Sequence, residues 1–324
     1  AALKARIGGN REQSRFEYTI GRTPEERARI TPPGRHIVRV LSEIQYAIPL
    51  SQAHGGAFDA AVDAALKRLE GEMDRAGALG REACAEAEKE LLPLSGAARE
   101  YEIIFAGHAH IDMNWMWGWQ ETVAVTLATF RTVLNLMREY PDFTFSQSQA
   151  SVYSIVEEHD PEMMEEIRSR IAEGRWEVTA SAWVETDKNM PDTESLIRHI
   201  RETRDYLQSH WGVDPDSVKV DFSPDTFGHS AFVPEISAFG NVKYYYHCRG
   251  VRNEMVLYRY RAPSGSEVLV YKEPYWYNSG VTPDCAAGLF ELSRRCAGLK
   301  TGLIVYGVGD HGGGVTRRDV ERVL

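Results

Sequence analysis

The 324-residue sequence is poor in cysteine, contains no long apolar run and shows no excess of basic residues. Its four cysteines form neither CxxC pairs nor a dense framework, so reduced thiols in a cytoplasmic protein are the simplest expectation, although a processed secreted protein has the same counts. No stretch approaches the ~18 consecutive apolar residues of a membrane span, and the N-terminus lacks the apolar core of a signal peptide. We therefore expect a cytoplasmic protein with no membrane partner.

The charge balance excludes another class of partner. The formal net charge is -10 at pH 7, whereas binding to nucleic acid phosphates requires a basic surface. With 43% hydrophobic and 26% charged residues, the chain has the composition of an ordinary globular protein that is long enough to bury a large core. We expect a folded protein with no nucleic acid partner.

The sequence also lacks internal repeats and a Gly-rich phosphate loop after its first expected strand. The pattern of expected secondary structure changes after residue 100. Residues 58–92 are rich in Ala, Leu, Glu and Arg, with apolar residues at helical spacing, and predict helices broken near Gly77 and Gly80. Residues 35–41 fit a short strand or the start of a helix, and residues 92–96 fit a linker. We expect a helical accessory region over 1–97 and a catalytic domain over 98–324.

From residue 100 onward, short β-prone runs alternate with helical patterns. Helices are predicted near 121–140, 152–173 and 193–210, and Asp192 is a natural N-cap for the third. The expected strands begin near residues 101, 143, 176, 218, 242, 267 and 303. Strands that alternate with helices indicate a parallel sheet, either closed as a barrel or doubly wound.

The segments that follow these strands carry the residues of a site. In parallel α/β folds, active sites lie beyond the carboxyl ends of the strands. Here these positions hold carboxylates, histidines, aromatics and glycines, in the segments GHAHIDMNW, AWVETDKNMP, PDTFGHS, EPYWYNSG and GDHGGG. Their shared location favours a site over scattered surface polarity.

The segment GHAHIDMNWMWG at residues 107–118 has the spacing of metal ligands. Residues at i, i+2 and i+4 of an extended chain share one face, so His108, His110 and Asp112 converge if the chain stays extended. Nitrogen and oxygen donors of this kind suit zinc or a similar divalent ion. The alternative is a set of satisfied polar residues in a turn.

Asp225 and the aromatic residues complete the pattern. Asp225 sits on a bend after Pro224 that can aim its carboxylate at a site, although it can equally close a loop as an Asx-turn residue. Several aromatic residues lie in the segments that follow the strands, where flat rings can stack on the apolar face of a sugar. The pattern therefore fits a carbohydrate better than a charged small molecule.

Five segments give the sequence a wider resemblance. They are GHAHIDMNWMWGWQET, SQSQASVYSIVEEHDPEMMEEI, AWVETDKNMPDTESLIRHI, SPDTFGHSAFVPEI and GVGDHGGGVTRRD, and they span residues 100–324 in order. Together they resemble glycoside hydrolase family 38, the class II α-mannosidases. The resemblance implies a (β/α)7-type barrel of the glycoside hydrolase and deacetylase kind, preceded by a smaller, mostly helical region. It also implies that the chain covers the N-terminal region and most of the barrel.

The resemblance implies a zinc-dependent retaining α-mannosidase that releases terminal α-D-mannosyl residues from oligosaccharides or glycans through a covalent glycosyl-enzyme intermediate. One zinc would be bound by His110, Asp112 and Asp225, and Asp225 would also be the nucleophile. Trp115 matches the tryptophan that stacks beneath the mannose. The family's fourth zinc ligand, a histidine, comes from a later part of a longer chain, and longer members often assemble, so a homo-oligomer is possible.

Other residues receive roles by position. Asp310 of GDHGGG is the first candidate for the acid/base, followed by Asp284, because Asn278 occupies a place where some relatives carry an acidic residue and an amide donates no catalytic proton. For each of these carboxylates, capping of a loop is the alternative role. Expected sugar-binding residues are Glu185, Asp187, Asn189 and Tyr277, and expected supporting residues are His108 and His229.

Two other functions compete with the mannosidase. A metal-dependent carbohydrate deacetylase or amidohydrolase also places His-x-His and Asp at strand ends, but uses zinc to activate a water molecule. An inactive carbohydrate-binding fragment would bind sugar without turnover.

Overall fold

A computed structural model describes residues 34–251, 255–296, 298–309 and 312–324 of the protein. Its contacts divide the chain into two compact units. The first unit ends at Glu102 and also contains Pro283–Glu291, and the second contains Ile103–Thr282 and Leu292–Leu324. Part of helix α13 (Pro283–Arg295) thus packs with the N-terminal region.

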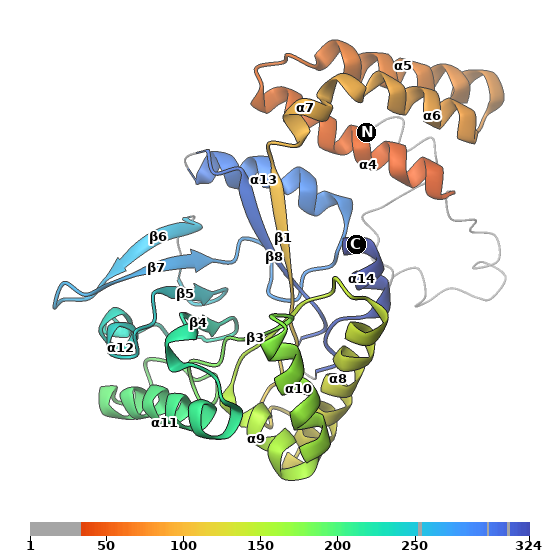
Figure 1. The fold of residues 1–324 in the computed structure, drawn as a ribbon. Helices are drawn as coiled ribbons and strands as arrows, with labels where there is room; N and C mark the ends of the chain where they lie inside the picture. Colours follow the sequence, from red (N-terminus) through yellow and green to blue (C-terminus); the bar gives the residue numbers. More distant parts are fainter. Residues whose placement is uncertain (1–33, 252–254, 297, 310–311) are drawn as a thin grey trace. The chain divides into compact units, whose positions relative to one another are not determined.

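The first unit is helical, as the composition of residues 58–92 predicts (Figure 1). It contains α4 (Arg35–Ala53), α5 (Asp59–Ala76), α6 (Arg81–Glu90), η1 (Leu92–Leu94) and α7 (Ser95–Ala98). The predicted break near Gly77 and Gly80 is confirmed, because α5 ends at Gly77 in the left-handed region and α6 begins after Gly80. Residues 35–41 form the start of α4, and the expected linker at 92–96 is instead two short helical turns.

The second unit is an α/β domain (Figure 1). Its first half contains β1 (Glu102–Gly107), α8 (Trp119–Glu139), β2 (Phe145–Gln147), α9 (Ala150–His159), α10 (Pro161–Ala172), β3 (Trp176–Val178) and α11 (Thr193–Trp211). Its second half contains η2 (Pro215–Ser217), β4 (Val220–Ser223), α12 (Val233–Phe239), β5 (Tyr244–His247), β6 (Leu257–Arg261), β7 (Glu267–Lys272), the end of α13, β8 (Thr301–Tyr306) and α14 (Arg317–Val323). The expected alternation of strands and helices is confirmed.

Two helix predictions have different outcomes. The predicted helix near 152–173 is in fact two helices, because Pro161 cannot continue α9 and Asp160 caps α10 by accepting a hydrogen bond from the Met163 backbone N–H at 2.9 Å. The prediction for α11 is confirmed at its start, where the Asp192 side chain accepts from the Ser195 N–H at 2.7 Å. The local rules of capping therefore fix both boundaries.

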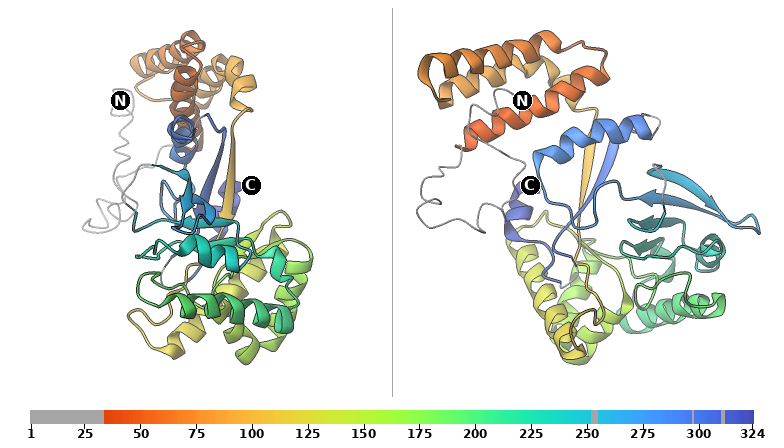
Figure 2. Two further views of the ribbon diagram at one scale, coloured as in Figure 1. Left: turned by 90° about the vertical axis from the view of Figure 1, so that its left-hand side faces the viewer. Right: turned by 180° about the vertical axis from the view of Figure 1, so that it is seen from behind.

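The described strands form three sheets: β1 with β8, β2 with β3, and the four strands in the order β4-β5-β7-β6. Figure 2 shows β1 and β8 side by side. The pairs β2-β3, β4-β5 and β5-β7 are parallel, as expected, but β6 was not predicted and pairs antiparallel to β7 in a hairpin.

The predicted (β/α)7-type barrel is not confirmed, because the strand pairings among the described residues do not form one continuous sheet. Strands β2 and β3 have three residues each and β4 and β5 have four, so the ladders are short. Between the sheets only isolated bridges such as His108 with Ser146 are found in the described residues. The α/β class holds, but the arrangement of its sheets differs from the prediction.

The largest core lies beneath the helices α8 to α10 and is rich in aromatic side chains. Trp176 of β3 is 1% exposed, packs edge-on against Phe130 and Phe145, and donates its indole N–H to the Tyr153 hydroxyl at 3.0 Å. This packing anchors the strands whose ends carry the site. In the described part of the chain, no helix is long and apolar enough to cross a membrane.

Candidate active site and metal centre

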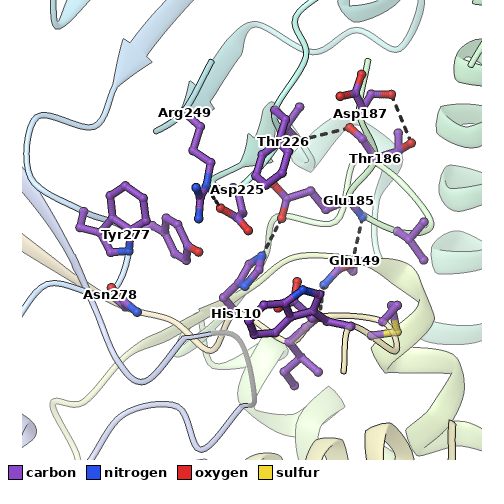
Figure 3. A pocket seen from close by; sticks show the side chains of 17 residues that line it. His110, Gln149, Glu185, Thr186, Asp187, Asp225, Thr226, Arg249, Tyr277 and Asn278 are labelled. Carbon is purple, nitrogen blue, oxygen red and sulfur yellow. Dashed lines mark hydrogen bonds and ion pairs between the residues drawn. The ribbon is translucent and has the colours of Figure 1, made fainter. Parts of the chain in front are cut away.

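One cavity of about 660 Å³ is lined by the segments that follow β1, β2, β3, β4, β5 and β7 (Figure 3). Its walls combine carboxylates, an imidazole, a guanidinium and exposed rings. This is the edge at which the sequence predicted a site, because carboxyl ends of strands meet there. The lining residues that matter below are His110, Asp112, Trp115, Gln149, Glu185, Asp187, Asp225, Phe227, Arg249, Trp276 and Tyr277.

Three of these residues form a potential metal site. His110, Asp112 and Asp225 each offer a ligand atom, and these atoms all lie within 4.8 Å of one another. His110 and Asp112 come from the loop after β1, and Asp225 comes from the bend after β4. Two segments more than a hundred residues apart in sequence thus meet at one point.

The state of the His110 imidazole shows that these residues fit a divalent ion. Its Nε2 lies 2.8 Å from Oε2 of Glu185, whereas its Nδ1 is buried and has no hydrogen-bond partner. A buried polar atom without a partner is costly, and a metal bond would satisfy it. Burial lowers the pKa of His110, but the Glu185 hydrogen bond and three nearby carboxylates outweigh burial and raise it. The site is therefore already arranged for positive charge.

Glu185 links the two halves of this site. While Oε2 contacts His110, Oε1 accepts hydrogen bonds from the Asp225 backbone N–H at 2.6 Å and from the Thr226 hydroxyl at 3.0 Å. Both oxygens of the residue expected to bind sugar are therefore engaged within the protein. Its carboxylate fixes the distance between the imidazole and the bend that carries Asp225.

Gln149 holds the neighbouring loops together. It is the residue before α9 and has a positive φ of 67°, which is uncommon for a residue other than glycine. Its amide accepts from the Glu185 N–H at 2.9 Å and donates to the Ile111 carbonyl at 2.9 Å. This strained backbone is maintained at the site, where it connects the His110 loop to the Glu185 loop.

The Asp225 carboxylate faces a cation. The Arg249 side chain donates from Nε to Oδ1 of Asp225 (Figure 3). Its guanidinium lies 4.8 Å from the centre of the Phe227 ring and 4.9 Å from that of Trp276. The Tyr277 hydroxyl lies beside both groups, and burial followed by the Asp225 charge raises the pKa of this hydroxyl. A protonated phenol and a guanidinium thus surround one carboxylate.

The other predicted site residues lie in different places. Trp115, Asp187 and Tyr277 line the cavity, whereas Asn189 is exposed beside it and donates its backbone N–H to Asp187. His108 is buried outside the cavity lining, with its Nδ1 2.8 Å from the Ser146 carbonyl oxygen, and His229 also lies outside the lining.

The two candidates for the acid/base are placed as follows. Asp310 lies outside the described residues. Asp284 belongs to the helical unit, where its carboxylate accepts a hydrogen bond from Gln45.

Arg249 lines the cavity but was not indicated by any sequence motif. It follows β5 after a single cysteine, so the same rule about strand ends applied to it. A lone arginine has no spacing pattern, and only the fold reveals that it reaches the carboxylate of Asp225.

Glu273, which follows β7 and supports the wall that carries Tyr277, permits a prediction about pH. It is 4% exposed, and its carboxylate accepts from the Tyr246 hydroxyl at 2.7 Å and from the Tyr275 N–H at 3.1 Å. Burial raises the pKa of Glu273 from 4.5 to about 7, against the smaller opposing effect of these hydrogen bonds. The folded state therefore binds its proton more tightly than the unfolded state does.

Between pH 4.5 and 7 the folded state holds more protons at Glu273 than the unfolded state, so this residue makes the free energy of unfolding fall as pH rises. Between pH 4.5 and pH 8, we expect the free energy of unfolding of Glu273→Gln to fall by about 2 to 3 kcal/mol less than that of the original protein. Urea unfolding of both proteins at pH 4.5 and pH 8 measures it, with the exposed Glu267→Gln as the matched control. An equal pH slope in the original and Glu273→Gln proteins would contradict the prediction.

Comparison with known proteins places the chain among the glycosyl hydrolases. Residues 100–323 match the model of the glycosyl hydrolases family 38 N-terminal domain. The chain therefore belongs to glycoside hydrolase family 38, and the family predicted from its motifs is confirmed.

Two curated relatives agree with this assignment, and a solved structure has a similar fold. Alpha-mannosidase G of Dictyostelium discoideum is 29% identical over 73% of this chain, and alpha-mannosidase 2C1 of Homo sapiens is 26% identical over 70%. The crystal structure of an alpha-mannosidase from Enterococcus faecalis V583 superposes on 68% of this chain with a TM-score of 0.57 and 20% identity. The chain spans only 22% of the length of each of the two curated relatives and 26% of that crystal structure.

Proposed function

We propose that this chain carries the metal centre and the nucleophile of a zinc-dependent retaining α-mannosidase that acts on mannose-containing oligosaccharides. The meeting of His110, Asp112 and Asp225 within 4.8 Å at a cavity with aromatic walls supports this proposal most directly. Relatives named alpha-mannosidase support the choice of mannose.

In this proposal Asp225 attacks the anomeric carbon. One carboxylate oxygen forms the bond to carbon as the glycosidic C–O bond breaks, and an acid, for which Asp310 is the candidate, protonates the leaving oxygen. A water molecule then hydrolyses the glycosyl-enzyme ester, and the same acid residue, now ionised, takes its proton. The sugar is released with its anomeric configuration retained.

The surrounding residues hold the Asp225 carboxylate in position. Arg249 donates to Oδ1 of Asp225, and Glu185 accepts from the Asp225 backbone N–H, so the carboxylate and the bend that carries it are both held in place. The exposed rings of Trp115, Phe227 and Trp276 line the cavity and can stack on the apolar face of a sugar. Asp187 at the same wall can accept hydrogen bonds from sugar hydroxyls.

Zinc would be held by His110, Asp112 and Asp225, and when bound it would supply Lewis acidity and orient vicinal sugar hydroxyls. In a mannoside the axial 2-hydroxyl and the 3-hydroxyl suit such a site. A nitrogen and two carboxylates also accept other divalent ions, so the choice of zinc rests on the family resemblance.

A substrate panel tests the function. We expect para-nitrophenyl α-mannoside to be hydrolysed and an N-acetylated glycan to keep its acetate, measured on this chain and on a version extended to the length of the relatives. Acetate release in place of nitrophenol would favour a deacetylase. Sugar binding without turnover in both versions would favour a carbohydrate-binding module.

A further inference from the structure

Two histidines that take no part in the proposed mechanism contact the Arg249 backbone carbonyl. Nε2 of His229 and Nδ1 of His247 each lie 2.9 Å from the Arg249 carbonyl oxygen, and the two rings lie 4.4 Å apart between centres. Both histidines stand outside the cavity lining, and His247 is completely buried. One carbonyl oxygen with two lone pairs therefore receives two imidazole groups.

The hydrogen-bond partners determine which nitrogen of each ring carries the proton. A carbonyl oxygen only accepts, so His229 donates from Nε2 and His247 donates from Nδ1. The opposite nitrogens lie 2.7 Å from the Tyr245 hydroxyl and 2.9 Å from the Tyr258 hydroxyl, which then act as donors. Burial lowers the pKa of both histidines, that of His247 to about 4, so each ring is neutral and has one N–H to give. Both N–H groups are used on Arg249.

Gly250 shows how closely this backbone is seated. Its φ is +88°, and a Cβ atom at this position would lie 2.5 Å from two atoms of the His229 ring and 2.6 Å from the Phe227 carbonyl oxygen. Only glycine fits such an approach. The Arg249–Gly250 peptide therefore lies directly against the His229 ring.

On this geometry we infer that His229 and His247 are positioning residues, which fix the Arg249 backbone so that its guanidinium meets the Asp225 carboxylate. The inference rests on the proposed function for its kinetic effect, because Asp225 is the proposed nucleophile. The two imidazoles act through Arg249 and do not contact the cavity. A misplacement of about 1 Å at a reacting group can cost about 100-fold in rate.

The decisive comparison uses substitutions that keep or remove the N–H group. The double variant His229→Phe/His247→Phe keeps ring volume but has no donor, and we expect kcat on an aryl α-mannoside to fall about 10- to 100-fold with KM changed by less than about 3-fold. The double variant His229→Gln/His247→Asn places an amide N–H near each original nitrogen and should regain most of kcat. A phenylalanine pair with unchanged kcat, or an amide pair no better than it, would overturn the inference.

Two tyrosines on β6 and β7 provide a matched pair. Tyr258→Phe removes the donor to His247 and should lower kcat. Tyr271→Phe removes a hydroxyl that donates to the Leu303 carbonyl, away from both histidines, and should leave kcat unchanged. Equal kcat values in the two variants would count against the inference.

A readout without turnover separates this inference from the proposed function. Long-range ¹H–¹⁵N correlation of the unaltered protein should show His229 protonated at Nε2 and His247 at Nδ1. The opposite tautomer at either ring overturns the inference even if the protein hydrolyses mannosides. Absent hydrolysis with the expected tautomers refutes the proposed function while the histidine arrangement stands.

Discussion

Asp225→Asn should abolish mannoside hydrolysis, with a fall in kcat on the order of 10⁴-fold or more, because an amide oxygen is too poor a nucleophile to form the glycosyl-enzyme ester. The substitution is nearly isosteric. Its backbone N–H still reaches Glu185, and its side-chain oxygen can still accept from Arg249. The fold should therefore persist, and the loss would reflect the missing carboxylate, which is both the proposed nucleophile and a proposed zinc ligand. Steady-state kinetics on para-nitrophenyl α-mannoside measure it.

The matched control is Asp192→Asn, which replaces another aspartate by asparagine at the N-cap of α11, where asparagine caps equally well. Its kcat should equal that of the original protein.

Azide added to Asp225→Gly tests the nucleophilic role directly, because a small anion can enter the vacated space and attack the anomeric carbon. A β-mannosyl azide product is expected. Full activity in Asp225→Asn would exclude Asp225 as the nucleophile.

The sequence predicted most of the local elements, because the signals for them are local. Asp192 begins α11 and Gly77 ends α5, as capping rules require. The failure at Pro161 came from reading apolar spacing across a residue that ends α9. The arrangement of the sheets was not predictable in the same way, because pairing depends on contacts between distant segments, and strands of three or four residues carry little pattern.

The same difference between local motifs and contacts between distant segments applies to the site residues. His110, Asp112 and Asp225 were predicted as site residues because each belongs to a motif of several residues. Arg249 carries no motif, and its role follows only from the fold, which brings β4 and β5 side by side in parallel register. Glu185 was predicted as a sugar-binding residue, but its contacts with His110 and Asp225 depend on loops whose conformation no residue spacing encodes.

Asp112→Ala should weaken zinc binding on the order of 10³-fold. Zinc binding free energies of about 10–16 kcal/mol are shared among about four ligands, so one carboxylate contributes several kcal/mol. Competition with a chromogenic chelator at fixed pH measures the affinity, and pH must be held because protons compete for the ligands. Asp187→Asn is the control, since Asp187 lines the same cavity but is not part of the three-residue group. Unchanged affinity in Asp112→Ala would contradict the metal site.

Glu185→Gln should have a smaller effect, about 10- to 100-fold in zinc affinity, because it changes the partner of a ligand and not a ligand. The carboxylate accepts from His110 on one oxygen and from the Asp225 N–H on the other. An amide has one oxygen, so either His110 or Asp225 must face an NH₂ group and lose its hydrogen bond. If Glu185→Gln weakens zinc binding as much as Asp112→Ala, Glu185 itself is a ligand. If it has no effect, the imidazole is oriented by other contacts.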